Sequence, residues 1–222
     1  MGRREDRPPI SPEAVPEAGW VAPELREEFP GLGLRYLLIE HGSGRAPRQV
    51  KKRLSALSNR FSGPQAINLR HQPIPWAYRV FYRHIGLDPD EQQTPVEAVA
   101  LERMKRGGFI SRSLLDDALT IAIIESGVAL RAFDAEQVEG RLGVRPTQPG
   151  EGLEGRPGEL PPGTLVIADE TRPLGLLFGA TAAGRGVKPR TTRMLVCAVQ
   201  VKGVPQIAVE EAIWLAADVI RS

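Results

Sequence analysis

The first candidate for chemistry is Cys197, the only cysteine among the 222 residues. A cysteine nucleophile needs a neighbouring base that holds it as the thiolate, and none of His41, His71 and His84 can be placed beside it from the sequence. Because Cys197 lies within the apolar run VCAVQV, we expect it to be a small buried core residue. His84 is expected at a helix end, with general-base catalysis as the alternative. One cysteine and three scattered histidines argue against a metal site.

Four aspartates stand at positions where either catalysis or local structure would use a carboxylate. Asp134, in RAFD, and Asp169, in LVIAD, are expected to fix turns by accepting hydrogen bonds from nearby backbone, and a functional role is the alternative. Asp116 and Asp117 are expected to cap a helix. They do not suit a catalytic carboxylate pair, because adjacent residues point to different sides of a helix.

The sequence is compatible with two roles for Arg131. The side chain either forms a surface pair with Glu136 or Glu139, or holds a phosphate or a substrate carboxylate through two parallel hydrogen bonds. Residues 150–155 read GEGLEG, which formally matches the dinucleotide fingerprint G-x-G-x-x-G. No strand leads into this segment, no helix follows it, and its two glutamates would repel a pyrophosphate. The sequence therefore predicts no dinucleotide and no other cofactor.

The charge balance is close to neutral, with 29 basic and 27 acidic residues and a net charge of +2. A dedicated nucleic-acid binder is usually far more basic, so any contact with nucleic acid must come from a local patch. Residues 45–112 are the candidate, because Trp76, Tyr78 and Tyr82 are interleaved there with many arginines and lysines. The alternative is a set of solvated helix faces.

Residues 107–145 contain the most apolar segment and must position these side chains. Residues 114–124 hold only three polar side chains, which predicts a helix buried inside the domain. Ser113 is a suitable N-cap, and Gly127 supplies the left-handed residue that often ends a helix. We predict that a short strand follows, around residues 138–144, near Gly140 and Gly143.

The remaining pattern predicts several further elements. Thr94, Pro95 and Glu97 form a capping box with proline at the first helical position, which predicts a helix over residues 95–106 closed by glycine. Residues 146–163 are rich in glycine and proline and should be loop. Further strands are expected within residues 31–40, 165–169, 173–179 and 193–201, with the middle two paired as a hairpin, and further helices at residues 47–61, 76–84 and 207–220.

These elements do not alternate regularly, so the fold class is α+β, a single domain with mixed sheets and packed helices. The proline-rich residues 1–22 are expected to form a disordered or loosely packed extension, with the domain spanning residues 23–222. The start of the chain does not resemble a secretory signal, and no segment approaches the ~20 apolar residues of a membrane span. We therefore expect a cytoplasmic protein that does not enter a membrane.

An ordered set of motifs resembles the B3/B4 editing domain of the bacterial phenylalanyl-tRNA synthetase β subunit. The set comprises LLDDALTIAIIES, GVALRAFDAEQVEG, LVIAD, PLGLLFG and TTRMLV, and it covers roughly residues 75–201. In that family, a helix with D-x-x-N is followed by a G-x-P-x-H-A-F-D turn, a strand ending LVIAD, a glycine-rich segment and paired threonines. The chain is too short to contain a synthetase catalytic domain as well, so it is similar to a freestanding form of this domain, without ligase activity.

The resemblance implies a pocket for the aminoacylated 3′ end of a tRNA. The matching positions imply substrate-binding residues Thr120, Arg131, Gly179, Thr191, Thr192 and Cys197. The basic region would take the acceptor stem, with tRNA-binding residues Arg79, Arg83, Arg106 and Arg112. At three positions this chain departs from the family, which has Asn at Thr120, His at Arg131 and Glu at Cys197. The helix over residues 114–124 would anchor one concave site, completed by the glycine and threonine segments.

Two hypotheses follow. The first is a tRNA-related RNA-binding protein that takes an aminoacyl-tRNA 3′ end or an amino-acid-like small molecule without catalysis, as the three departures favour. The alternative is a trans-acting deacylase that hydrolyses mischarged tRNA with a positioned water, as the retained glycines and threonines favour. An aminoacyl ester is already activated, so a positioned water and backbone N–H donors suffice without a strong nucleophile. The sequence leaves the catalytic residues, the amino acid, the tRNA and the oligomeric state open.

Overall fold

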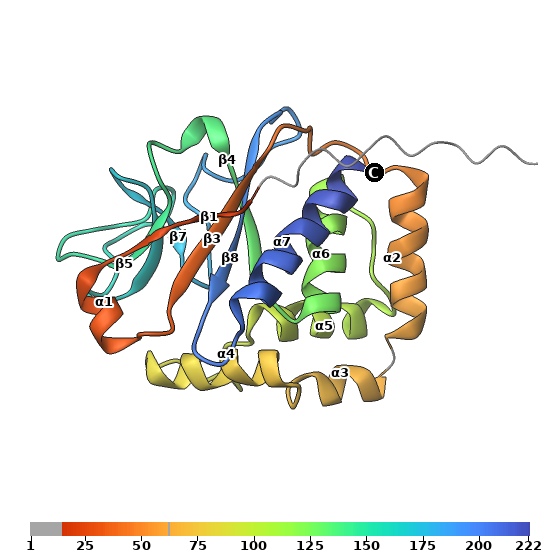
Figure 1. Ribbon diagram of the computed structural model, residues 1–222, viewed down its shortest axis with the longest axis horizontal. Coiled ribbons are helices and arrows are strands. Elements are labelled where there is room, and N and C mark those ends of the chain that lie inside the picture. The colour runs from red at the N-terminus through yellow and green to blue at the C-terminus, as the bar shows by residue number, and fades with distance from the viewer. Residues whose placement is uncertain (1–14, 62) are drawn as a thin grey trace, which may run out of the picture.

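The computed structural model describes residues 15–61 and 63–222 (Figure 1). The helices are α1 (Pro23–Glu28), α2 (Arg48–Arg60), α3 (Gly63–Leu69), α4 (Pro73–His84), α5 (Pro95–Arg106), α6 (Leu114–Ser126) and α7 (Gln206–Arg221), with a 3₁₀ turn at Ala135–Gln137. The strands are β1 (Glu17–Ala18), β2 (Trp20–Val21), β3 (Gly33–Ile39), β4 (Leu130–Asp134), β5 (Gly143–Pro146), β6 (Leu165–Ala168), β7 (Pro173–Leu176) and β8 (Met194–Gln200).

The strands form two four-stranded sheets. The first, in the order β1-β3-β8-β4, is antiparallel throughout. The second, in the order β2-β5-β6-β7, is mixed, because β2 runs parallel to β5. Helices α6 and α7 pack on one side of the first sheet, and the second sheet lies on its other side (Figure 1). The predicted α+β class is confirmed, as is the hairpin of β6 and β7.

Helix α6 has the ends and the burial that its sequence predicts. The Ser113 hydroxyl accepts a hydrogen bond from the Asp116 amide at 3.0 Å, and Gly127 closes the helix in the left-handed conformation. The buried Asp117 carboxylate accepts bonds from the Ser111 hydroxyl and the Arg112 amide. Both aspartates therefore stabilise the entry to the helix, as expected.

The strand predicted around residues 138–144 is wrong in position. The chain becomes extended directly after Gly127, and β4 pairs in antiparallel register with β8. Residues 138–142 are loop, and β5 begins only at Gly143. The reason is tertiary, because β8 lies far along the chain and supplies the hydrogen-bonding partner that makes LRAFD a strand.

Ordered structure also begins earlier than the expected boundary at residue 23. β1 pairs with β3, and β2 pairs with β5. The indole N–H of Trp20 donates to the Arg141 carbonyl at 3.0 Å, which helps to hold β2 in place. The rest of the predicted extension, residues 1–14, lies outside the described residues.

The other predicted elements are confirmed within one to three residues at their ends. The capping box of α5 is formed, and Gly107 ends that helix. The predicted inner face of α7 is buried along its length. Helix α4 starts at Pro73, earlier than expected, because proline is tolerated in a first helical turn. Helix α3 was not expected from the sequence.

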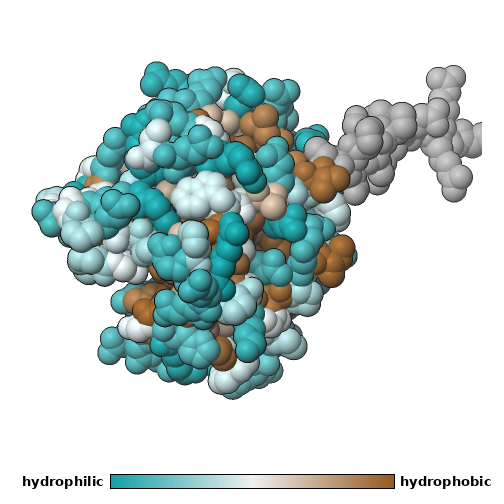
Figure 2. Space-filling view, turned by 60° about the vertical axis from the view of Figure 1, so that its left-hand side comes forward, coloured by the Kyte–Doolittle hydropathy of each residue, from teal (hydrophilic) through white to brown (hydrophobic). Residues whose placement is uncertain are grey.

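Large apolar side chains lie mostly inside, between the first sheet and its helices and between the two sheets. Figure 2 shows one face of the molecule, where hydrophilic residues predominate and hydrophobic ones form small separate patches. A smaller cluster around Leu153 and Leu160 packs under the 150–163 loop. In the part of the chain that the structure describes, no helix has both the length and the apolar character that a bilayer crossing requires.

Candidate functional site

Arg131 lies at the centre of the site, on the edge strand β4. Its side chain reaches the turn after β7, where Nη1 donates to the Leu176 carbonyl at 2.5 Å. Nη2 donates to the Gly179 carbonyl at 3.1 Å and to the Thr181 hydroxyl at 2.7 Å. The guanidinium carbon also lies 5.1 Å from the centre of the Phe133 ring. Arg131 therefore ties β4 to the glycine-containing turn of the second sheet.

The surface pair expected between Arg131 and Glu136 or Glu139 is not formed. Among the described residues, Glu136, Glu139 and the other acidic side chains form no ion pair with it. Burial lowers the pKa of Arg131, and its Nε is buried without a hydrogen-bond partner. A guanidinium stays charged under such conditions, so this cation is balanced only by carbonyl and hydroxyl dipoles.

A cavity of about 210 Å³, here called the Arg131 cavity, opens beside this guanidinium. It is lined by residues 129–131 of the β4 segment, by residues 177–179 of the turn, and by Gln93, Pro95, Ala98 and Val199. Most of these side chains are apolar. A second cavity of about 200 Å³ shares residues 177–179, which form a wall between the two. A mostly apolar pocket with one cation suits a small ligand that carries a carbonyl or carboxylate group.

The 177–179 wall is fixed by aromatic packing. The Phe178 ring lies 5.9 Å from Tyr78, 6.1 Å from Phe81 and 5.1 Å from Tyr82, measured between ring centres. All three partners belong to α4. The turn on which Gly179 sits is thus held from one side by α4 and from the other by Arg131.

Two residues of this site were missed by the sequence analysis. A Cβ at Gly175 would lie 2.9 Å from the Ala180 carbonyl and 3.2 Å from Nη2 of Arg131, so a larger residue would displace the turn backbone and crowd the guanidinium. Among the described residues, Thr181 supplies the one side-chain acceptor to which Arg131 donates. The sequence PLGLLFGAT contains no local signal for either residue. Their role depends on the fold, which brings β7 and the turn after it close to the Arg131 side chain on β4.

Cys197 lies opposite Arg131 in the pairing of β8 with β4, so the register brings these two predicted residues together. The thiol is fully buried, and burial raises its pKa to about 12. The positive charge of Arg131 opposes this shift but does not cancel it. At neutral pH the group is therefore a protonated thiol inside the sheet, as expected for a core residue.

We expect native Cys197 to resist alkylation. A thiol whose pKa rises from 9.0 to about 12 has a thiolate population about 1000-fold smaller at pH 8, and burial excludes the reagent as well. Iodoacetamide labelling followed by mass spectrometry checks this without ambiguity, since the chain has one cysteine. Labelling in urea is the control. Native labelling as fast as that of a free thiol would contradict the buried placement.

The paired threonines lie elsewhere. The buried Thr191 hydroxyl donates to Oδ2 of Asp134 at 2.7 Å and accepts from the Lys188 amide at 3.0 Å. Thr192 is exposed. Asp134 and Arg131 are three residues apart on β4, which corresponds to about 10 Å. The structure therefore uses Thr191 to hold the loop before β8 and does not bring the threonine pair to Arg131.

Thr120 occupies a third place. It lines a groove of about 200 Å³ between α5 and α6, together with Arg106 and Arg112. The single concave site expected to combine Thr120 with Gly179 and the threonine pair is therefore not formed. The register places Cys197, in the middle of β8, opposite Arg131, whereas Thr191 lies before β8 begins. Thr120 faces α5 from α6.

Of the four predicted tRNA-binding arginines, Arg79 is buried, with 5% of its side chain exposed. Its guanidinium pairs with Asp90 at 2.6 Å and with Glu97 at 2.6 Å. These contacts join α4 to the start of α5 and give Arg79 a structural role.

The other three predicted arginines are about half exposed, and each faces a carboxylate. Arg83 lies 3.8 Å from Asp90 and over the Trp76 ring. Arg106 and Arg112 both pair with Glu102, the first at 3.1 Å. Their charges are thus partly balanced within the protein.

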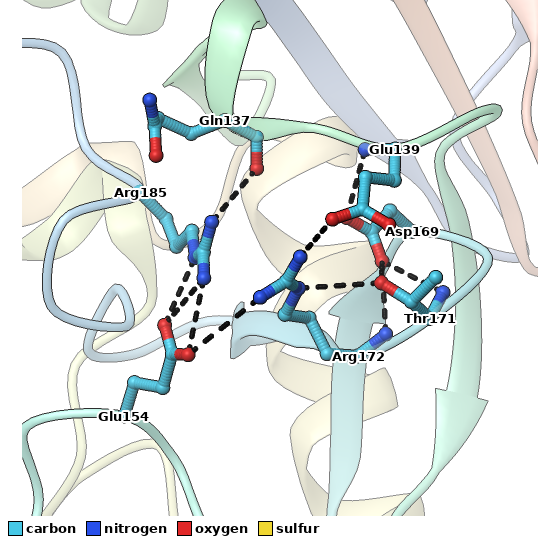
Figure 3. Close-up of polar contacts among 7 residues, drawn as sticks. All are labelled: Gln137, Glu139, Glu154, Asp169, Thr171, Arg172 and Arg185. Carbon is cyan, nitrogen blue, oxygen red and sulfur yellow. Dashed lines mark hydrogen bonds and ion pairs between the residues drawn. The ribbon is translucent and has the colours of Figure 1, made fainter.

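Asp169 fixes a turn, as expected, within the network that Figure 3 shows. Its carboxylate accepts bonds from the Glu139, Thr171 and Arg172 amides and from the Thr171 hydroxyl. Nearby, Glu154 pairs with Arg185 at 2.8 Å, and Arg172 pairs with Glu139 and, at 3.8 Å, with Glu154 (Figure 3). The network joins the loops that surround the second sheet. Among the described residues, no group of three or more acidic, histidine or cysteine side chains is placed to hold a metal ion.

A family profile described as the B3/4 domain matches residues 77–211, which include α5, α6, the strands β4 to β8 and the start of α7. Residues 1–76 lie outside the match, so α2 and α3 are not covered by it.

Several curated relatives share about a third of the aligned residues. The phenylalanine–tRNA ligase beta subunit of Legionella pneumophila (strain Lens) is 34% identical over 99 residues, which is 42% of this chain and 12% of that protein. The corresponding subunit of Xanthomonas euvesicatoria is 37% identical over 94 residues, 41% of this chain and 12% of its own length. That of Streptomyces avermitilis is 35% identical over 94 residues, 41% of this chain and 11% of its own length. The alignment thus involves only a small part of each relative, and the matched share of this chain shows that it belongs to the B3/4 domain family.

Proposed function

We propose that this protein binds the aminoacylated 3′ end of a tRNA, or a free ligand with the same amino-acid chemistry, in the Arg131 cavity and without a catalytic side chain of its own. The observation that carries the proposal is the partly buried Arg131 guanidinium, which has no acidic partner among the described residues and borders a mostly apolar cavity. The relatives with which the chain shares its family are subunits of a tRNA ligase, which supports a tRNA-derived ligand.

The chemistry of such a ligand fits this cavity. An aminoacyl ester offers a side chain to the apolar walls and a carbonyl oxygen to a cation. The orphaned Nε of Arg131 is one donor that remains unused. Because leaving such a buried donor unpaired destabilises the unliganded state, a ligand acceptor that reaches it gains more than a solvent-exposed contact would.

The groups around the cavity do not supply a nucleophile or a general base. The Cys197 thiol is protonated, and the residues lining the Arg131 cavity include neither histidine nor a carboxylate. Hydrolysis would therefore depend on a positioned water and on backbone donors, as in the deacylase alternative. Binding without catalysis is therefore the proposed function.

The test compares charged and uncharged tRNA. We expect a panel of aminoacyl-tRNAs to include one that binds at least about tenfold tighter than its uncharged form, a difference of about 1.4 kcal/mol. The Arg131→Gln variant should lose that difference. The Arg156→Gln variant is the matched control, because Arg156 is exposed and the charge change is the same. Fluorescence anisotropy gives the affinities, and circular dichroism checks that Arg131→Gln still folds.

Equal binding of charged and uncharged tRNA across the panel, with no binding of free amino acids, would refute the proposal. Release of the amino acid at a rate above that in buffer, removed by Arg131→Gln and retained by Arg156→Gln, would replace the binding function with the deacylase function.

A further inference from the structure

The distribution of charge along the chain is uneven in a way that the net charge of +2 hides. Residues 41–87 contain nine arginines and lysines and not one aspartate or glutamate. Any acidic partner for these cations must therefore come from elsewhere in the chain. Which of them find one is decided by the fold.

The fold provides carboxylates for four of the nine. Arg53 pairs with Glu125 at 2.8 Å, and Arg60 lies 3.9 Å from the same carboxylate. Arg79 and Arg83 face Asp90, as described above. These pairs face α6 or the 88–93 loop, so they stabilise the packing of α2 and α4.

Four others form an exposed group at the start of α2, here called the α2 basic face: Arg45, Arg48, Lys51 and Lys52. Within residues 15–61 and 63–222, none of the four has an acidic side chain within ion-pair distance. Helical periodicity places Arg48 and Lys52 one turn apart on the side opposite the buried Val50, Leu54 and Leu57. Helix α2 stands at one edge of the molecule, on the side away from the second sheet (Figure 1).

This arrangement is unfavourable for the helix itself. The first turn of α2 contains no acidic residue, its N-cap is Pro47, and no side chain caps it. Cations at this end of a helix are repelled by the positive end of the helix dipole. Stability alone would therefore favour acidic residues here, and an external anion would relieve the repulsion.

The segment before α6, which carries the predicted arginine Arg112, lies against α2 and the residues that precede it. The Leu114 amide donates to the Gly44 carbonyl at 2.7 Å, and the Phe109 amide donates to the Ser58 hydroxyl at 3.0 Å. These bonds hold the segment that contains Arg112 against α2. Glu102 balances Arg112, so the unbalanced charge is concentrated on α2 itself.

We infer that the α2 basic face binds backbone phosphates of the tRNA whose 3′ end enters the Arg131 cavity, an inference that rests on the proposed function. Four uncompensated cations within eight residues complement the regular negative charge of a nucleic-acid backbone. An anionic membrane is the poorer partner, because exposed large hydrophobic residues, which anchor an interfacial helix, are absent from α2. Helix α2 lies outside the family match, so this surface is a feature of this chain beyond the matched domain.

The experiment compares two double variants on one helix. Arg48→Gln/Lys52→Gln removes two unpaired charges from the α2 basic face. Arg53→Gln/Arg60→Gln removes two charges that are paired with Glu125 and is the matched control. Each variant and the wild type are titrated, from about 50 to 200 mM KCl, with a full-length aminoacyl-tRNA and with a 3′-aminoacyl-CCA trinucleotide. Anionic phosphatidylserine vesicles are a third probe.

We expect Arg48→Gln/Lys52→Gln to weaken tRNA binding at least tenfold at the lowest salt. The slope of log affinity against log salt should become shallower by about 0.9 for each phosphate that the variant no longer neutralises. Its affinity for the trinucleotide should not change. The control should retain the wild-type slope.

An unchanged tRNA affinity in Arg48→Gln/Lys52→Gln, or an equal loss in both variants, would overturn the inference while leaving the proposed function standing. If the wild type bound neither tRNA nor trinucleotide, the proposed function would fail and this inference with it. Vesicle binding that depends on Arg48 and Lys52, with tRNA binding unaffected by them, would replace RNA with a membrane surface.

Discussion

Replacing Arg79 with methionine is expected to lower the free energy of unfolding by about 3 kcal/mol. The methionine fills much of the same volume but leaves the carboxylate of Glu97, of which 13% is exposed, without its counterion. Removing one partner of a buried pair is more costly than never forming the pair, because the remaining charge has lost its water. Urea denaturation followed by circular dichroism measures the change.

Two further variants show whether the missing partner is the cause. Arg83→Met on the same helix removes an exposed arginine 3.8 Å from Asp90 and should change stability by less than about 0.5 kcal/mol. Arg79→Met/Glu97→Gln should recover part of the loss, because glutamine keeps the capping bond to Thr94 and leaves no buried charge. No recovery in the double variant would show that poorer packing, and not the unpaired carboxylate, explains the effect.

The second large effect is expected for Asp169→Asn, at about 2 to 3 kcal/mol. One oxygen of Asp169 accepts the Thr171 and Arg172 amides and the Thr171 hydroxyl, and the other accepts the Glu139 amide at 3.0 Å. Asparagine would present its NH₂ group either to the Glu139 amide or to the three donors of Thr171 and Arg172. In both cases an N–H group would face another hydrogen-bond donor inside the protein. Thr171→Val, which removes one neutral donor, should cost about 1 kcal/mol or less.

The pH dependence gives an independent check. Burial alone would raise the pKa of Asp169, but the hydrogen bonds from the three amides and the Thr171 hydroxyl outweigh it and hold the pKa below its usual 3.8. A lowered folded-state pKa stabilises the protein above the unfolded-state value, and this contribution is lost as the pH falls through the folded-state pKa. The difference in the free energy of unfolding between the wild type and Asp169→Asn should therefore shrink below about pH 4. A constant difference between pH 7 and pH 3 would show that Asp169 does not titrate as the contacts imply.

Both predictions concern residues that position the Arg131 cavity. Arg79 holds α4 against the start of α5, whose Pro95 and Ala98 line it. Asp169 fixes the turn between β6 and β7, and β7 leads into the 177–179 wall. If either variant folds with reduced stability, the cavity should lose ligand affinity as well, although neither side chain contacts it.

The sequence by itself determined the elements whose signals are local. The capping box at Thr94, the N-cap at Ser113 and the glycine at position 127 act within a few residues, and the structure forms all three. The periodic apolar residues of α7 identified its buried face in the same way. The ordered motifs identified the family, because a family is a property of sequence.

Only the tertiary structure decided where the site residues lie and which charges stay unbalanced. The strand β4 and the meeting of Arg131 with Cys197 depend on the register with β8, which no local pattern encodes. The same register separates Thr191 from Arg131. Arg79 and the cations of the α2 basic face look alike in the sequence. The fold gives Arg79 two carboxylates, Asp90 and Glu97, but among the described residues it places none within ion-pair distance of the α2 basic face. Pairing across long stretches of chain depends on the packing of whole elements, and that packing decided the chemistry available at each side chain.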